Sequence, residues 1–96
     1  MIELTEEQLK SLEDMSAALL PPSEIAILLN IDADIQKLFC EMCKNHCNSD
    51  IYKHYQRGKL NTKYELRRTV IKLAKAGSPA AEPLADKYIK EQEQLE

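Results

Sequence analysis

Residues 20–32 read LPPSEIAILLNID, and this stretch decides the fold that the sequence predicts. The two prolines end one helix, and Pro22 is acceptable in the first turn of the next because that position needs no backbone donor. Ile25 and Leu29 then place apolar side chains on one helical face. Asn30 follows, and asparagine tolerates the left-handed conformation of a tight helix stop. The stretch therefore predicts a short helix of about two turns.

Helical patterns lie on both sides of this short helix. Thr5 followed by Gln8 has the pattern of a capping box and predicts a helix over residues 6–19. Asp32 is suited to cap a helix over residues 33–45, after which helix breakers cluster. No stretch has the pattern of a strand, so we expect an all-α fold that begins with a three-helix helix-turn-helix bundle.

A long helix is predicted over residues 50–76, with Gly77 suited to the position just after its end. Gly58 is the weak point of this helix, because glycine costs about 1 kcal/mol relative to alanine in an ordinary helix interior. Residues 78–79 can begin a final helix, whose regular part starts at Pro83. We expect the final helix to fold back on the long one as an antiparallel hairpin.

The 96 residues are enough for one domain, and 44% apolar and 30% charged residues are typical of a globular protein. Within it we expect a helix-turn-helix unit over residues 1–48 and a long basic helix plus C-terminal helix, the oligomerisation region, over residues 49–96. The longest apolar run is far shorter than a bilayer-spanning helix, and the amino terminus is acidic, so we expect a cytoplasmic protein. Three cysteines suggest reduced thiols rather than a disulfide framework.

The charges are strongly segregated along the chain. Residues 1–49 hold three lysines against nine acids, whereas residues 50–76 hold eight cations against only two acids. The eight cations are Lys53, Arg57, Lys59, Lys63, Arg67, Arg68, Lys72 and Lys75. A local positive field attracts polyanions whatever the total charge, so these are the candidate nucleic-acid contacts. The competing explanation is that they neutralise the acidic remainder within the fold or across an oligomer.

The long helix has an apolar arc and a cationic arc. The apolar arc consists of Ile51, Tyr52, Tyr55, Leu66, Val70 and Leu73. Leu60, Tyr64 and Ile71 instead project among the cations, which predicts a second contact surface. That surface meets either the final helix or a neighbouring subunit, and we expect a homo-oligomer.

Residues 20–32 resemble the homeodomain-like helix-turn-helix of phage and transposase proteins. Six positions match that pattern as they stand: Pro22, Glu24, Ile25, Ala26, Leu29 and Ile31. Asn30 stands where glycine is usual and Asp32 where serine or threonine is usual. The resemblance implies a recognition helix over residues 33–45, where Gln36 and Lys37 are the candidate base contacts. Asp34 opposes that role, because duplex affinity depends on neutralising phosphates.

Two later stretches, IYKHYQRGK at 51–59 and LAKAGSPAA at 73–81, are similar to the portion after the helix-turn-helix in small terminase subunits of tailed phages. That family implies recognition of phage DNA, ring-like oligomers and delivery of DNA to a large terminase subunit. We therefore expect a non-enzymatic double-stranded DNA-binding protein of phage or prophage packaging, in the cytoplasm of a bacterial host. The alternatives are a helical adaptor whose basic helix binds an acidic protein, and a helix-turn-helix transcriptional regulator.

Four side chains resemble a metal-ligand cluster: Cys40, Cys43, His46 and Cys47. On a continuous helix Cys40 and Cys47 are about 10 Å apart along the axis, whereas two sulfurs on one zinc lie within roughly 4 Å. They are therefore weak candidates, and we expect neither a metal nor another cofactor. No phosphate-binding loop or catalytic triad can be identified, so we expect no enzymatic activity.

Overall fold

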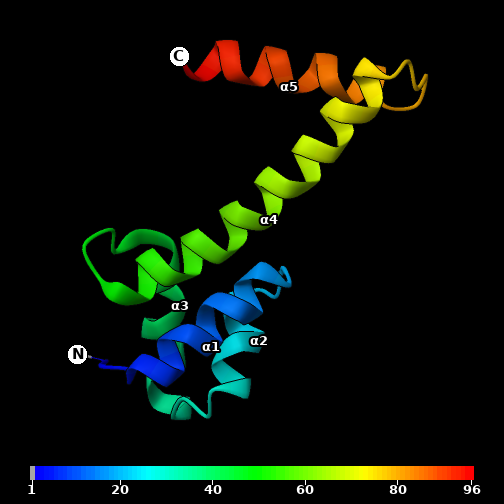
Figure 1. The fold of residues 1–96 in the computed structure, drawn as a ribbon. Helices are drawn as coiled ribbons and strands as arrows, with labels where there is room; N and C mark the ends of the chain where they lie inside the picture. The colour runs from blue at the N-terminus through cyan, green and yellow to red at the C-terminus, as the bar shows by residue number, and fades with distance from the viewer. Residues whose placement is uncertain (1) are drawn as a thin grey trace. The chain divides into compact units, whose positions relative to one another are not determined.

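The structure is a computed structural model that describes residues 2–96, and over that range it contains helices and no strand. Figure 1 shows α1 (Glu6–Ala17), α2 (Pro22–Leu28), the 3-10 turn η1 (Ala33–Ile35), α3 (Gln36–Asn45), α4 (Asp50–Lys75) and α5 (Glu82–Leu95). The predicted all-α class is confirmed. No helix within these residues is both long enough and apolar enough to cross a membrane.

The chain forms two compact units, and the division between them falls inside α4. Unit 1 ends at Thr62, and unit 2 is Lys63–Glu96. The sequence placed a boundary at residues 48–49, before α4 begins. The first turns of α4 belong with unit 1 because Ile51 and Tyr55 are buried in its core.

The core of unit 1 is built from apolar side chains of α1, α2, α3 and the beginning of α4. Its buried members are Leu12, Ile25, Ala26, Ile31, Phe39, Met42, Cys43, Ile51 and Tyr55. Ser16 is the buried polar residue among them, and its hydroxyl donates to the carbonyl oxygen of Tyr55. This hydrogen bond satisfies a polar group that would otherwise be costly to bury.

The capping box predicted for α1 is confirmed. The Gln8 backbone N–H donates to Thr5 Oγ1 at 3.1 Å, and the Thr5 backbone N–H donates to Gln8 Oε1 at 2.9 Å. Two backbone donors at the helix N-terminus are thereby satisfied by side chains. The helix begins at Glu6, as predicted.

Three helices end at a residue in the left-handed conformation. These residues are Leu19 with φ 67°, Asn30 with φ 58° and Gly77 with φ 91°. In each case the next backbone N–H donates to the carbonyl oxygen five residues earlier, as in a Schellman motif: Leu20 to Met15, Ile31 to Ala26 and Ser78 to Leu73. The helix predicted over 6–19 ends earlier, at Ala17, because Leu19 leaves the helical conformation.

Gly58 has a different role from the one expected. It is buried, and a Cβ atom at this position would overlap the α1 backbone. The glycine therefore permits a close approach of α1 and α4, and it is not merely a weak point in the long helix.

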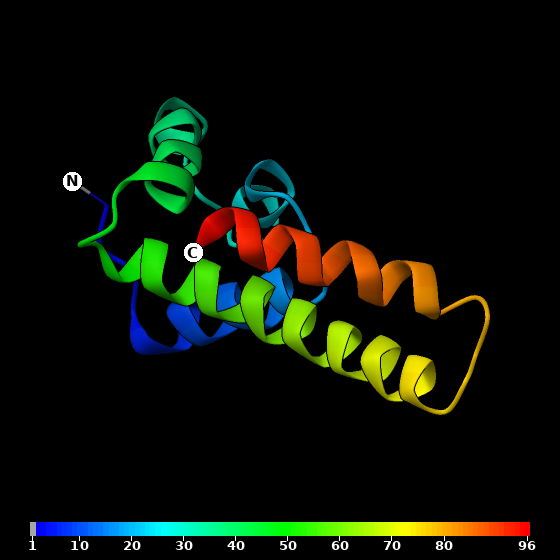
Figure 2. The same ribbon diagram turned by 90° about the horizontal axis from the view of Figure 1, so that it is seen from above.

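Unit 2 contains the C-terminal half of α4 and α5, joined by the turn at Gly77 that can be followed in Figure 2. α5 begins at Glu82, later than residues 78–79, with Pro83 in its first turn. Among the residues of this unit, 63–96, only Ala81 is buried. Unit 2 therefore has almost no core of its own.

Candidate nucleic-acid interface

The unit 1 part of α4 presents three of the predicted cations. Lys53, Arg57 and Lys59 are all exposed. Arg57 Nη1 lies 4.0 Å from Glu13 Oε1, the same atom that His54 Nδ1 approaches at 3.0 Å. Such a long, exposed contact leaves the Arg57 guanidinium available to a polyanion.

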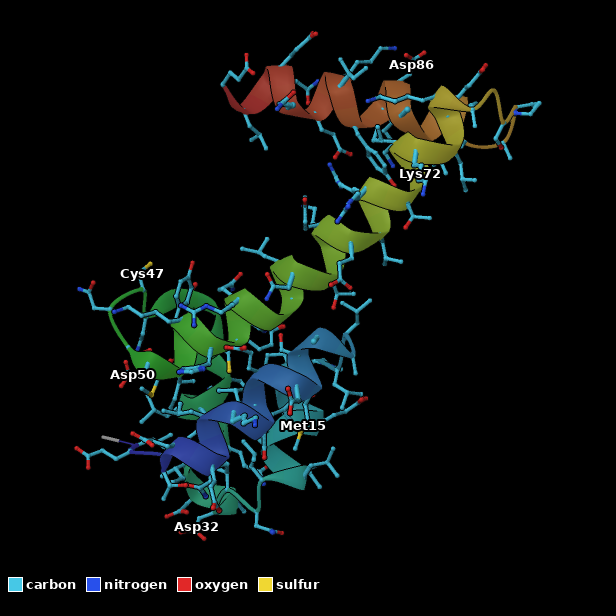
Figure 3. The ribbon with its side chains drawn as sticks, viewed as in Figure 1. Met15, Asp32, Cys47, Asp50, Lys72 and Asp86 are labelled. Atoms are coloured by element: carbon cyan, nitrogen blue, oxygen red, sulfur yellow. The ribbon has the colours of Figure 1, made fainter. Side chains whose placement is uncertain are left out.

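The unit 2 part of α4 presents four more of the predicted cations. Lys63, Arg68, Lys72 and Lys75 are exposed, and Figure 3 labels Lys72 near the end of the helix. None of these four forms an ion pair with any residue of the described range. Such cations can neutralise phosphates, which releases the counterions condensed on DNA and favours association.

Arg67 differs from the other seven cations. Its Nη2 donates to Glu91 Oε2 at 2.7 Å, and its guanidinium lies 4.1 Å from the centre of the Tyr88 ring. This hydrogen bond lowers the pKa of the Glu91 carboxyl. Arg67 therefore joins α4 to α5 within unit 2, and it is not free in the way the sequence suggested.

The residues predicted to contact bases lie at the start of α3. Gln36 is half-buried, and its Nε2 donates to the carbonyl oxygen of Ile31 at 3.0 Å. Lys37 is exposed, but Asp32 and Asp34 are exposed beside it. The Gln36 amide thus helps to hold the turn before α3, and the surface there carries more negative than positive charge.

The three apolar residues predicted as an oligomer interface have different surroundings. Leu60 and Tyr64 are 51% and 63% exposed. Ile71 is half-buried and lines a groove of unit 2 together with Tyr88 and Leu95. Ile71 is therefore at least partly covered by α5 of its own chain.

The cysteines are not gathered into a metal site. Cys43 is buried, Cys40 is half-buried, and Cys47 and His46 are exposed. Burial, and secondarily the neighbouring Cys40 thiol, raises the pKa of Cys43 to about 12. Within residues 2–96 no three potential metal ligands are grouped closely enough to hold an ion.

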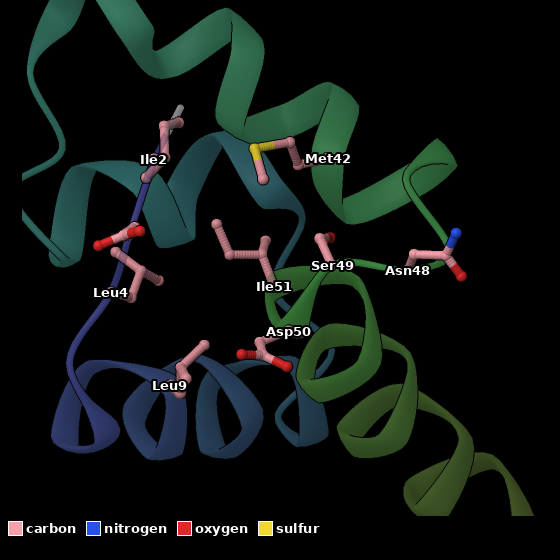
Figure 4. A pocket seen from close by; sticks show the side chains of 9 residues that line it. Ile2, Leu4, Leu9, Met42, Asn48, Ser49, Asp50 and Ile51 are labelled. Carbon is pink, nitrogen blue, oxygen red and sulfur yellow. The ribbon is translucent and has the colours of Figure 1, made fainter.

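Unit 1 also has a cleft of about 350 Å³, shown in Figure 4. Its apolar lining includes Leu4, Leu9, Met42 and Ile51, and the Asp50 side chain lies between those of Leu9 and Ile51. It contains none of the predicted cations or metal ligands. The cleft therefore adds nothing to a polyanion-binding surface.

The sequence analysis missed the partners of Arg67. Tyr88 and Glu91 are three residues apart and so share a face of α5, which is the one signal that the sequence carries for them. The sequence carries no signal for the hydrogen bond between Glu13 and His54, because these residues are distant in the chain and meet only when α1 packs on α4.

Comparisons with protein-family models, curated proteins and solved structures found no match for this chain. The functional argument therefore rests on the residues themselves.

Proposed function

We propose that this chain is a non-enzymatic protein that binds double-stranded DNA through the exposed cations of α4. The observation that carries the proposal is that seven of the eight predicted cations are exposed. Six of those seven form no ion pair within residues 2–96. If the basic segment served to neutralise acids of its own chain, these side chains would be paired. A surface of unpaired cations is instead suited to a polyanion.

The contact surface in this proposal is α4, not α3. Asp32 and Asp34 would lie near phosphates if α3 entered a major groove, and phosphate contacts dominate duplex affinity. The Gln36 amide is already hydrogen-bonded to Ile31. We infer that α2 and α3 form a helix-turn-helix that serves as a packing unit, and that α5 folds back on α4 as a hairpin.

The biological setting in this proposal comes from the resemblance to small terminase subunits. It makes the chain a component of phage or prophage DNA packaging in the cytoplasm of a bacterial host, with a large terminase subunit as a partner. The stretches 51–59 and 73–81 that support this idea include Gly58 and Gly77, whose structural roles are close helix contact and helix termination. The packaging setting and DNA binding are therefore separate proposals, and the experiment below tests DNA binding.

DNA binding is tested by fluorescence anisotropy with a labelled 30-base-pair duplex at several salt concentrations. The logarithm of affinity should fall with the logarithm of salt, with a slope of about −0.9 per phosphate neutralised. The double variant Arg68→Gln, Lys72→Gln should bind more weakly and show a shallower slope. Arg67 is left unchanged because its loss would also disturb α5.

The matched control is Lys87→Gln, Lys90→Gln, which removes the same charge from exposed positions of α5. This variant should bind DNA almost as well as the wild type. If the two double variants weakened DNA binding equally, net charge rather than the α4 surface would govern binding. Absence of binding by the wild type at low salt would refute the proposal and favour the adaptor with an acidic protein partner.

A further inference from the structure

Tyr64 is the most exposed aromatic residue of the range 2–96. The chain has one phenylalanine, four tyrosines and no tryptophan. The other four aromatic side chains are buried or half-buried: Phe39, Tyr52, Tyr55 and Tyr88. Tyr64 is 63% exposed, and it does not line the groove of unit 2 to which Ile71 belongs. Its ring is therefore accessible to a ligand.

The side chains beside Tyr64 on the same face of α4 are cationic. At 100° per residue, Arg68 lies about 40° and Lys75 about 20° from Tyr64 around the helix axis. Both cations are exposed, and neither forms an ion pair within residues 2–96. Glu65 is the single acid of residues 63–75 and lies about 100° away. An accessible aromatic ring thus belongs to a surface that is suited to a polyanion.

Fully paired DNA offers little to an aromatic ring in this position. The bases of a duplex are stacked on one another, so a helix that contacts phosphates meets mainly sugars and phosphate oxygens. An unpaired strand instead exposes the faces of its bases, and an aromatic side chain can stack on any of them. Cations that contact the backbone, combined with an aromatic ring for the bases, are the combination that proteins use to bind unpaired nucleic acid.

We propose that Tyr64 stacks on an unpaired base of DNA whose phosphates contact Arg68 and Lys75. The α4 surface should therefore prefer DNA that contains an unpaired segment to fully paired DNA. This inference rests on the proposed function, because the cations must hold the DNA for the ring to reach a base. It adds a distinction between two forms of DNA that the cations alone do not make, since both forms carry phosphates.

Two other roles of Tyr64 have different consequences. A tyrosine hydroxyl can donate to a phosphate oxygen in paired and unpaired DNA alike. Tyr64→Phe would remove that contact, whereas stacking requires only the ring. The oligomer contact that the sequence predicts for Tyr64 would also serve both forms of DNA, so its loss would weaken the binding of both equally.

The experiment compares two labelled 30-base-pair DNAs by fluorescence anisotropy, one fully paired and one with a short central loop of unpaired thymines. The full chain should bind the looped DNA at least about fivefold more tightly, a modest value for one stacked base. Tyr64→Ala should remove this preference and leave the affinity for paired DNA nearly unchanged. Tyr64→Phe should keep the preference. The dependence of affinity on salt should be the same in Tyr64→Ala as in the wild type, because the ring neutralises no phosphate.

The matched control is Leu66→Ala, which removes an apolar side chain that is 57% exposed from nearly the opposite side of α4. This variant should keep the preference for looped DNA. Circular dichroism checks that each variant has the helical content of the wild type. A second measurement uses the unaltered protein: iodouracil replaces thymine in the loop, and irradiation should crosslink the DNA to Tyr64, as mass spectrometry of the peptides would show.

Equal affinity of the unaltered protein for the two DNAs would overturn the inference and leave the proposed function standing. Equal weakening of both complexes by Tyr64→Ala would overturn it in favour of an oligomer contact, and loss of the preference in Tyr64→Phe would do so in favour of a hydroxyl contact. Crosslinks only at other residues would also contradict stacking by Tyr64. Failure to bind either DNA at low salt would refute the proposed function, and this inference with it.

Discussion

Gly58 of α4 lies directly against the backbone of Glu13 in α1. A Cβ atom at residue 58 would be 2.2 Å from the Glu13 carbonyl oxygen and 3.0 Å from the Ala17 backbone nitrogen. Both neighbours are backbone atoms of a helix, so they cannot move aside without displacing α1. The absence of a side chain at this position is what allows the two helices to pack.

We predict that Gly58→Ala lowers the free energy of unfolding by about 1–3 kcal/mol, the usual cost of overpacking. This steric cost should outweigh the gain of roughly 1 kcal/mol in helix propensity. Urea unfolding followed by circular dichroism measures the change. Asn61→Ala, at an exposed position of the same helix, is the control and should be neutral or slightly stabilising. A stabilised Gly58→Ala protein would contradict the close packing.

The Arg67–Glu91 contact should respond to acid. Because the folded-state pKa of Glu91 is lowered, its contribution is present above the ordinary carboxyl pKa and is lost as pH falls through the lowered value. We expect the NMR signals of the Tyr88 ring to shift over that range as the guanidinium above it is released. Glu91→Gln should remove this acid transition. A transition of the same size in that variant would show that another group causes it.

Leu19 is an unfavourable residue for the conformation that it adopts. At φ 67° an L side chain is strained by about 1–2 kcal/mol, and Leu19 is 56% exposed, so it gains little from burial. Glycine relieves this strain but loses more conformational entropy on folding. Leu19→Gly should therefore raise the free energy of unfolding by the difference between the two effects, about 0.5–1 kcal/mol. Thermal and urea unfolding both measure this. Ala18→Gly, where φ is −81°, should instead be destabilising.

The three thiols should differ in reactivity. Cys43 is buried and its pKa is raised to about 12, so almost no thiolate forms there at pH 8. Cys47 is exposed and should be modified first by a thiol reagent such as iodoacetamide, followed by the half-buried Cys40. Mass spectrometry of peptides after timed quenching gives the order. Rapid labelling of Cys43 in the folded protein would contradict its place in the core.

The helical class of the fold could be predicted from the sequence because its signals are local. The Thr5–Gln8 capping box acts within one turn, and Asn30 and Gly77 stop helices through their own backbone preferences. Leu19 has no such preference and takes the left-handed conformation all the same. The end of α1 was therefore predicted two residues too late.

The sequence by itself determined the order of the helices and which segment is basic, since capping, periodicity and charge are properties of neighbouring residues. Only the tertiary structure decided that Arg67 pairs with Glu91, while Lys72 forms no ion pair with a residue of the range 2–96. It also decided that Gly58 is a site of close helix contact and not merely a weak point of α4. Both facts depend on which helix lies beside α4. No local pattern encodes that choice, because packing brings together residues that are distant in the chain.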